Sequence, residues 1–174
     1  MLSFRWILPA FAVFLVGCSA SRPPIDTVPK VELERFMGDW FVIAAIPTFI
    51  ERQAYNAIES YRLAPDGTVS TTFTFREGGF DGPLRRYTPT GYVRDDSAAV
   101  WGMQFIWPIR AEYRVAYLDP SYQQTIIART ARDYVWIMAR SPSVSEADYQ
   151  HLVEKVRALG YDTAQLRRVP QRWP

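Results

Sequence analysis

Phe36-Met37-Gly38-Asp39-Trp40-Phe41-Val42-Ile43-Ala44 begins the first long apolar run behind the N-terminal leader. Alternate residues of an extended strand point to opposite faces. One face is therefore expected to carry Trp40, Val42, Ala44 and Ile46, and the other Phe41, Ile43 and Ala45. Both faces are apolar, which predicts a strand covered by other structure on each side. Gly38 has no Cβ, so a short turn can lead directly into this strand.

Length and composition predict one domain rich in β structure. The chain has 174 residues, a usual size for a single domain with a substantial core. Hydrophobic residues make up 48% and aromatic residues 15%, which favours strands over helices. The 20 basic residues nearly balance the 18 acidic ones, so nucleic acid is not an expected partner.

The first residues have the pattern of a lipoprotein leader. Arg5 precedes an apolar run, Trp6 to Val16, that is too short to span a bilayer and fits a signal peptide. Leu15-Val16-Gly17-Cys18 resembles the lipobox of bacterial lipoproteins, in which the cysteine is acylated and becomes the mature N-terminus. We therefore predict a signal peptide over 1–17, lipidation (palmitate) at Cys18, and a location at the bacterial outer membrane. The alternatives are an ordinary secretory peptide or a buried free thiol.

A polar, proline-rich segment separates this leader from the domain. It contains Pro23, Pro24 and Pro29, and we interpret residues 18–30 as a lipidated tether. About a dozen residues in polyproline II would reach roughly 35–40 Å. The domain itself is expected over residues 31–174.

Seven further strand-like runs follow the first one. They cover 57–63, 69–75, 87–93, 101–105, 113–117, 123–129 and 134–140. Pro65-Asp66-Gly67 supplies the turn after the second strand. Pro89 predicts an edge or a bulge within the fourth. Eight short strands at this spacing are typical of an all-β sandwich or barrel.

One helix is expected near the C-terminus. Ser145 is a suitable N-cap, and Gly160 is placed to end the helix. Between them lies an apolar stripe at helical spacing: Tyr149, Leu152, Val153, Val156 and Leu159. This stripe is expected to cover the strands that have two apolar faces, 40–46 and 134–139.

Three signatures in order resemble those of the lipocalins. They are Gly38-Asp39-Trp40, the run from Glu112 to Asp119 with Tyr122 after it, and Trp136-Ile137-Met138-Ala139-Arg140. The resemblance covers about residues 31–171 and is greatest to the bacterial outer-membrane lipoprotein lipocalins and the related apolipoprotein D. It implies an eight-stranded antiparallel up-and-down barrel with one C-terminal α-helix packed outside. The second signature departs from the family, since Leu118 stands where many members have threonine.

The resemblance also implies roles for individual residues. Arg140 is expected to lie across the indole of Trp40 and, with Gly38, to close the barrel floor, a cation–π contact of roughly 0.5–2 kcal/mol. The family register assigns nine side chains to the ligand cavity: Tyr61, Phe73, Met103, Phe105, Tyr113, Val115, Tyr134, Trp136 and Met138. Some of these should fill the barrel near its floor, while eight strands leave room for one small ligand.

Charged residues near the cavity are the candidate head-group contacts. Glu59 shares a face with Tyr61, so it either points into the lumen or is exposed at a slipped register. Arg85 and Arg86 lie in a loop expected at the open end. Because a guanidinium can pair with two oxygens, they are candidates to hold a phosphate or carboxylate, although a mixed solvated rim is the alternative.

No pattern of residues indicates catalysis. His151 is the only histidine and lies on the predicted helix, so neither a Ser-His-Asp triad nor a histidine metal site is indicated. We predict a non-enzymatic protein without cofactor or metal. Its barrel, facing the periplasm, would bind, store or transport lipids such as fatty acids or lysophospholipids. A structural envelope lipoprotein with a filled barrel and a rare enzymatic lipocalin are the alternatives; the oligomeric state is not predicted.

Overall fold

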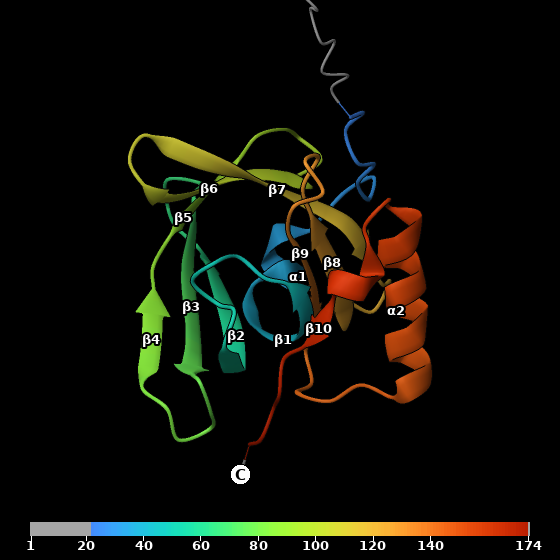
Figure 1. Cartoon of the computed structure of the whole chain (residues 1–174). Coiled ribbons are helices and arrows are strands. Elements are labelled where there is room, and N and C mark those ends of the chain that lie inside the picture. Colours follow the sequence, from blue (N-terminus) through green and yellow to red (C-terminus); the bar gives the residue numbers. More distant parts are fainter. Residues whose placement is uncertain (1–21, 174) are drawn as a thin grey trace, which may run out of the picture.

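The computed structural model describes residues 22–173, and their strands form the expected closed barrel (Figure 1). Neighbouring strands of the sheet pair antiparallel, and the first strand (Gly38–Ile46) pairs with the strand Val135–Ala139 to close it. The elements are α1 (Leu33–Phe36), β1 (Gly38–Ile46), β2 (Ala54–Leu63), β3 (Val69–Glu77), β4 (Leu84–Tyr87), β5 (Thr90–Val93), β6 (Val100–Ile106), β7 (Ile109–Leu118), β8 (Gln124–Ala128), β9 (Val135–Ala139), α2 (Glu146–Ala158), a 3₁₀ turn (Thr163–Gln165) and β10 (Arg167–Arg168). The predicted all-β fold with one outer helix is confirmed. The predicted signal peptide and Cys18 lie outside the described residues.

The fourth barrel strand is made of two pieces, β4 and β5. Both pair with β3, and the interruption falls at Thr88 and Pro89. Proline lacks the N–H that a continuous ladder needs, which explains the break. The irregularity expected at Pro89 is therefore present.

The first strand differs from the expected alternation. The register of β1 against β9 shifts between Val42 and Ala44, so the strand contains a bulge. Trp40 and Val42 face the barrel interior, but beyond the bulge Ala45 faces inward while Ala44 and Ile46 face outward. The prediction that Ala44 and Ile46 share the face of Trp40 is therefore wrong, because one extra residue reverses every side chain that follows it.

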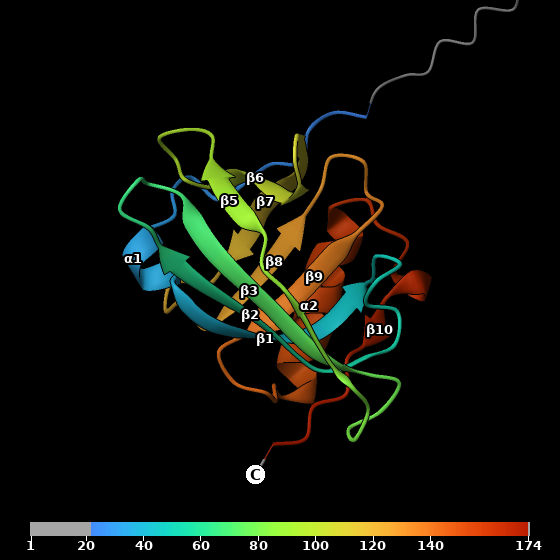
Figure 2. The same cartoon turned by 90° about the vertical axis from the view of Figure 1, so that its left-hand side faces the viewer.

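The end of the barrel at which α1 lies is filled with aromatic side chains. Phe36 at the end of α1 is fully buried, and its ring centroid lies 5.0 Å from that of Trp40 and 5.5 Å from that of Trp101. Trp101 stacks on Tyr113 at 4.9 Å. Tyr61 completes this group, which we call the aromatic plug (Phe36, Trp40, Tyr61, Trp101 and Tyr113). Figure 2 shows α1 at this end of the barrel and the β1–β2 loop at the other.

Helix α2 covers the outside of the barrel over β1, β8 and β9, and its start agrees with the prediction. The Ser145 hydroxyl accepts a hydrogen bond from the Asp148 N–H, and Gly160 follows the helix at a φ of +87°. Beneath the helix lies an outer core formed by side chains of both layers: Ile43, Ile46, Ile126, Val135, Ile137, Tyr149, Leu152, Val156 and Tyr161. Within residues 22–173, no helix is long and apolar enough to cross a bilayer.

The segment from Arg22 to Val31 lies against the barrel. The Arg132 guanidinium donates to the Pro23 carbonyl (2.8 Å), and the Val28 N–H donates to the Val115 carbonyl (3.0 Å). Ile25 is buried in the outer core. Much of the predicted tether is therefore held on the domain, so it does not extend freely over the dozen residues assumed from its composition.

Candidate functional site

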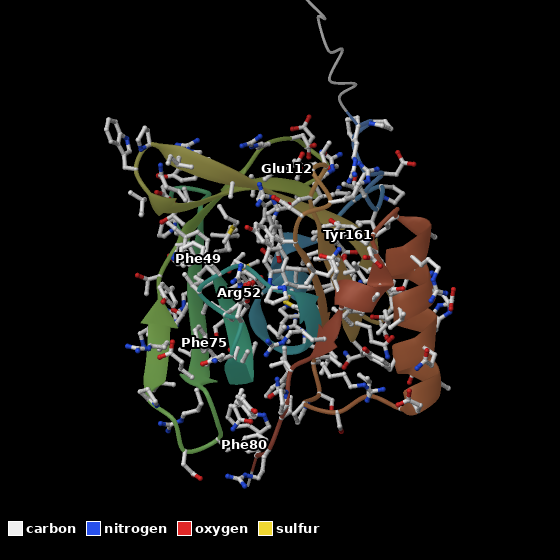
Figure 3. The ribbon with its side chains drawn as sticks, viewed as in Figure 1. Phe49, Arg52, Phe75, Phe80, Glu112 and Tyr161 are labelled. Atoms are coloured by element: carbon white, nitrogen blue, oxygen red, sulfur yellow. The ribbon has the colours of Figure 1, made fainter. Side chains whose placement is uncertain are left out.

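The half of the barrel toward the β1–β2 loop, opposite α1, encloses an open-ended cavity of about 490 Å³. Aromatic and aliphatic side chains form most of its wall: Phe49, Ile50, Phe73, Tyr87, Met103, Phe105, Ile106, Ala111, Tyr113 and Trp136. The wall includes Phe49 from the loop after β1 and Glu112 from strand β7, both labelled in Figure 3. A volume of this size is typical of a site for one small ligand.

The nine side chains predicted for the cavity separate into three groups. Phe73, Met103, Phe105, Tyr113 and Trp136 line it as expected. Tyr61, Val115 and Met138 are buried in the inner core and fill the barrel. Tyr134 is half-buried beside Arg129 and does not line the cavity, so its assignment to the wall is wrong.

The floor has the predicted contacts. The Arg140 guanidinium carbon lies 3.9 Å from the Trp40 ring centroid. The same guanidinium donates to the carbonyls of Arg35, Phe36, Met37 and Asp39 at 2.8–3.0 Å. Gly38 has a φ of +93°, and a Cβ at this position would lie 3.3 Å from Arg140 Nη1. Arg140 therefore joins the end of α1 to the start of β1, which keeps Phe36 inside the barrel.

Arg85 and Arg86 do not reach the cavity. Both are exposed on β4, and neither belongs to the wall. Arg85 Nε donates to Glu77 Oε2 at 2.8 Å across the β3–β4 pair. Arg86 lies on the strand face opposite to that of Phe75 and Tyr87, whereas Arg85 is in register with Phe75 but is held by Glu77 at an exposed position, so the geometry does not support the expected head-group contact.

Two glutamates, Glu51 and Glu59, line the cavity. Glu59 lines the cavity, which resolves the alternatives that the sequence left open, and Tyr61 donates a hydrogen bond to it. Burial, together with repulsion from Glu51, raises the pKa of Glu59 to about 8. Burial also raises the pKa of the Tyr113 hydroxyl, which lies 2.7 Å from the Tyr61 hydroxyl.

Glu51 lines the cavity although the sequence analysis did not assign it there. It is 5% exposed and accepts hydrogen bonds from the Thr48 N–H and hydroxyl, both at 2.9 Å, and from Trp136 Nε1 at 3.2 Å. Burial raises its pKa against the opposing effect of these bonds. The spacing Thr-x-x-Glu favours a hydrogen bond between these two residues, so it could have indicated the Thr48–Glu51 contact from the sequence.

Arg129 is the one cation among the described residues that line the cavity. It pairs with Asp133 at 3.3 Å, and its Nε is buried without a hydrogen-bond partner. Glu112 at the same level is paired with Arg114 at 3.0 Å and accepts from Thr130. These hydrogen bonds outweigh its burial, so the pKa of Glu112 is lowered.

The mouth of the cavity is bordered by exposed apolar side chains. Phe49, Ile106 and Trp107 are 76%, 73% and 82% exposed, and Ile109 is exposed beside them. We call these four residues the apolar rim. Residues 22–173 contain no group of three or more His, Cys, Asp or Glu side chains that could hold a metal ion.

Comparisons with known proteins are consistent with this geometry. A family model described as a lipocalin-like domain matches residues 31–171. Temperature-induced lipocalin-1 of Arabidopsis thaliana is 31% identical over 157 residues, which are 86% of this chain and 84% of that protein. The outer membrane lipoprotein Blc of Citrobacter freundii is 26% identical over 166 residues, 92% of each chain.

Solved structures agree in fold. The cockroach allergen Per a 4 matches with a TM-score of 0.66 at 18% identity, covering 87% of this chain and 96% of that one. Insecticyanin of the tobacco hornworm Manduca sexta matches with a TM-score of 0.65 at 15% identity, covering 85% of each chain. At these identities the likeness concerns the barrel alone.

Proposed function

The chain belongs to the family of lipocalin-like domains, and from this premise we propose that its barrel binds lipid-like amphiphiles by burying their apolar part, without chemistry. Fatty acids, lysophospholipids and similar molecules form the proposed class. The observation that carries the proposal is the cavity of about 490 Å³ that opens at one end of the barrel. This space also favours binding over the alternative of a structural lipoprotein with a filled barrel.

The cavity wall has the chemistry that a hydrocarbon tail requires. Burial of each methylene contributes about 0.8 kcal/mol, so a tail of ten methylenes gains on the order of 8 kcal/mol before the costs of association. Phe73, Met103 and Trp136 offer the apolar surface for this contact. The expected affinity is therefore micromolar or somewhat tighter.

Anchoring at the outer membrane through acylated Cys18 is part of the same proposal. It is supported by the lipobox-like sequence and by the outer membrane lipoproteins among the relatives. Arg22 donates to the Ala131 carbonyl in the loop between β8 and β9, at the mouth end of the barrel. Four residue steps from Arg22 to Cys18 span at most about 14 Å. Such a short connection would hold the apolar rim near the membrane surface.

A cavity-filling variant tests the proposal. Ala111 lines the cavity, and Ala111→Trp would occupy its space. We expect this variant to weaken binding of a fluorescent fatty-acid analogue at least tenfold. The matched control is Leu63→Trp, which adds the same ring at an exposed position. Unchanged binding by Ala111→Trp would show that the analogue binds outside the barrel, and mass spectrometry of copurified lipid would then be expected to find none.

A further inference from the structure

Glu59 is the feature of the cavity that a simple tail-binding barrel does not need. It pairs in register with Trp40 on β1 and with Phe73 on β3, which places it directly above the aromatic plug. Its carboxylate accepts from the Tyr61 hydroxyl, which in turn contacts the Tyr113 hydroxyl. A carboxyl group in such a position is costly unless it has a partner.

The protein itself supplies little positive charge to this carboxyl. The charged residues of the wall are Glu51, Glu59, Glu112 and Arg129. Glu112 is paired with Arg114, and Arg129 with Asp133. Within residues 22–173, neither Glu51 nor Glu59 forms an ion pair. The unpaired charge in the cavity is therefore acidic.

Glu51 and Glu59 differ in how many further hydrogen bonds their carboxyl oxygens can accept. Glu51 accepts from Thr48 and Trp136 with both oxygens and secures the β1–β2 loop. Glu59 has one protein donor, on Oε2. Glu59 is thus the carboxyl with free capacity toward the cavity.

Aromatic faces surround the same space. Phe73, Tyr87, Tyr113 and Trp136 all line the cavity with Glu59. A cation beside such rings is attracted by their π faces, and the attraction grows when water is excluded. An acid combined with several rings is the arrangement that recognises quaternary or protonated amines.

We propose that the inner end of the cavity is a subsite for an ammonium group, so that the preferred ligands are amphiphiles that carry a cation at the end entering first. This inference rests on the proposed function and narrows its ligand class. Where Glu59 is ionised, a carboxylate directed inward would meet it as a like charge, and a bare methyl end would leave it without a cationic partner.

Because Glu59 must release its proton before it can pair with a cation, binding at the subsite should depend on pH. The pKa of Glu59 is raised to about 8, with Glu51, Tyr61, Tyr87, Tyr113, Glu112 and Arg129 as the titratable or charged groups around the cavity. At pH 7 the carboxyl is therefore mostly protonated, and a cation binds best after its proton has left. Affinity for a cation should rise about tenfold per pH unit below 8 and level off above it.

The test compares two probes of equal chain length, dodecyltrimethylammonium and 1-dodecanol, each kept below its aggregation concentration. Neither probe titrates between pH 6 and 9. The purified full chain, freed of detergent, is titrated by tryptophan fluorescence. For the cation we expect a gain in affinity of roughly fiftyfold from pH 6 to 8, and for dodecanol little change.

Glu59→Gln should abolish the pH dependence and the preference for the cation while dodecanol still binds. Glu77→Gln, at a half-buried glutamate of β3 outside the cavity wall, is the matched control and should behave as the wild type. A wild-type protein that binds both probes equally at pH 9, or a pH profile that persists in Glu59→Gln, would overturn the subsite but leave tail binding intact. Failure of both probes to bind would overturn the proposed function together with the subsite.

Discussion

Replacing Arg140 by alanine should destabilise the barrel far more than loss of an ordinary surface arginine. Its guanidinium stacks on Trp40 at 3.9 Å and donates to four carbonyls around the end of α1. Hydrogen bonds from a charged donor contribute about 1.5–3 kcal/mol each, but these share one group and are not additive. With ~0.5–2 kcal/mol for the cation–π contact, we expect a loss of about 3–4 kcal/mol. The melting temperature should fall by roughly 10 °C.

The assay is urea unfolding followed by circular dichroism, with Arg168→Ala as the matched control. Arg168 also lies over a ring, that of Tyr149 at 3.7 Å, but it is exposed and pairs only with Glu146. Its loss should cost less than about 1 kcal/mol. Arg140→Lys should recover only part of the stability, since an ammonium cannot reach four carbonyls at once. Equal losses at Arg140 and Arg168, or full rescue by lysine, would refute the reasoning.

Three further predictions concern other parts of the chain. Gly38→Ala should destabilise more than Gly67→Ala, because both glycines have φ near +80° to +93° but only a Cβ at Gly38 would meet Arg140; equal losses in thermal unfolding would contradict this. Wild-type stability should decline from pH 5 to 8, because the folded pKa of Glu59 lies above its unfolded value of 4.5, so the unfolded chain loses the proton first. Glu59→Gln should reduce that decline in urea titrations and leave the part that belongs to Glu51, whose pKa is also raised; an undiminished decline would assign it to another group. Cys18→Ala should abolish palmitate labelling and release the protein from the membrane fraction, whereas surviving label would disprove the lipobox assignment.

The alternation of apolar residues predicted most of the strands but not the bulges within them. The register of β7 against β8 shifts between Val115 and Tyr117, as that of β1 does between Val42 and Ala44. Tyr117 therefore packs in the outer core under Lys155. A bulge depends on how two distant segments pair, so a pattern read along one strand cannot locate it.

Prediction of the site succeeded for side chains whose position follows from the strand register. It failed for side chains whose position depends on a loop or on a partner distant in sequence. Phe73 and Met103 were placed correctly because they lie on regular strands. Glu51 was not assigned to the cavity, since nothing near it in sequence reveals that Trp136 donates to it from β9. Arg85 was expected to contact a ligand at the mouth, but it lies on β4 and pairs with Glu77 of the neighbouring strand.

The aromatic plug packs the closed end of the barrel, and this packing does not depend on which ligand occupies the open end. Truncating a plug residue such as Trp101 leaves a sealed void, with costs near 3–5 kcal/mol. Truncating Met103 or Trp136 only enlarges a space that already opens to water, so the void term is small. Apart from Tyr113, which belongs to both the plug and the cavity wall, the residues that stabilise the fold are different from those that contact the ligand. Libraries varied only at Phe73, Met103, Ala111 and Trp136 should therefore yield new specificities on an unchanged scaffold, and natural divergence among such barrels has the same freedom.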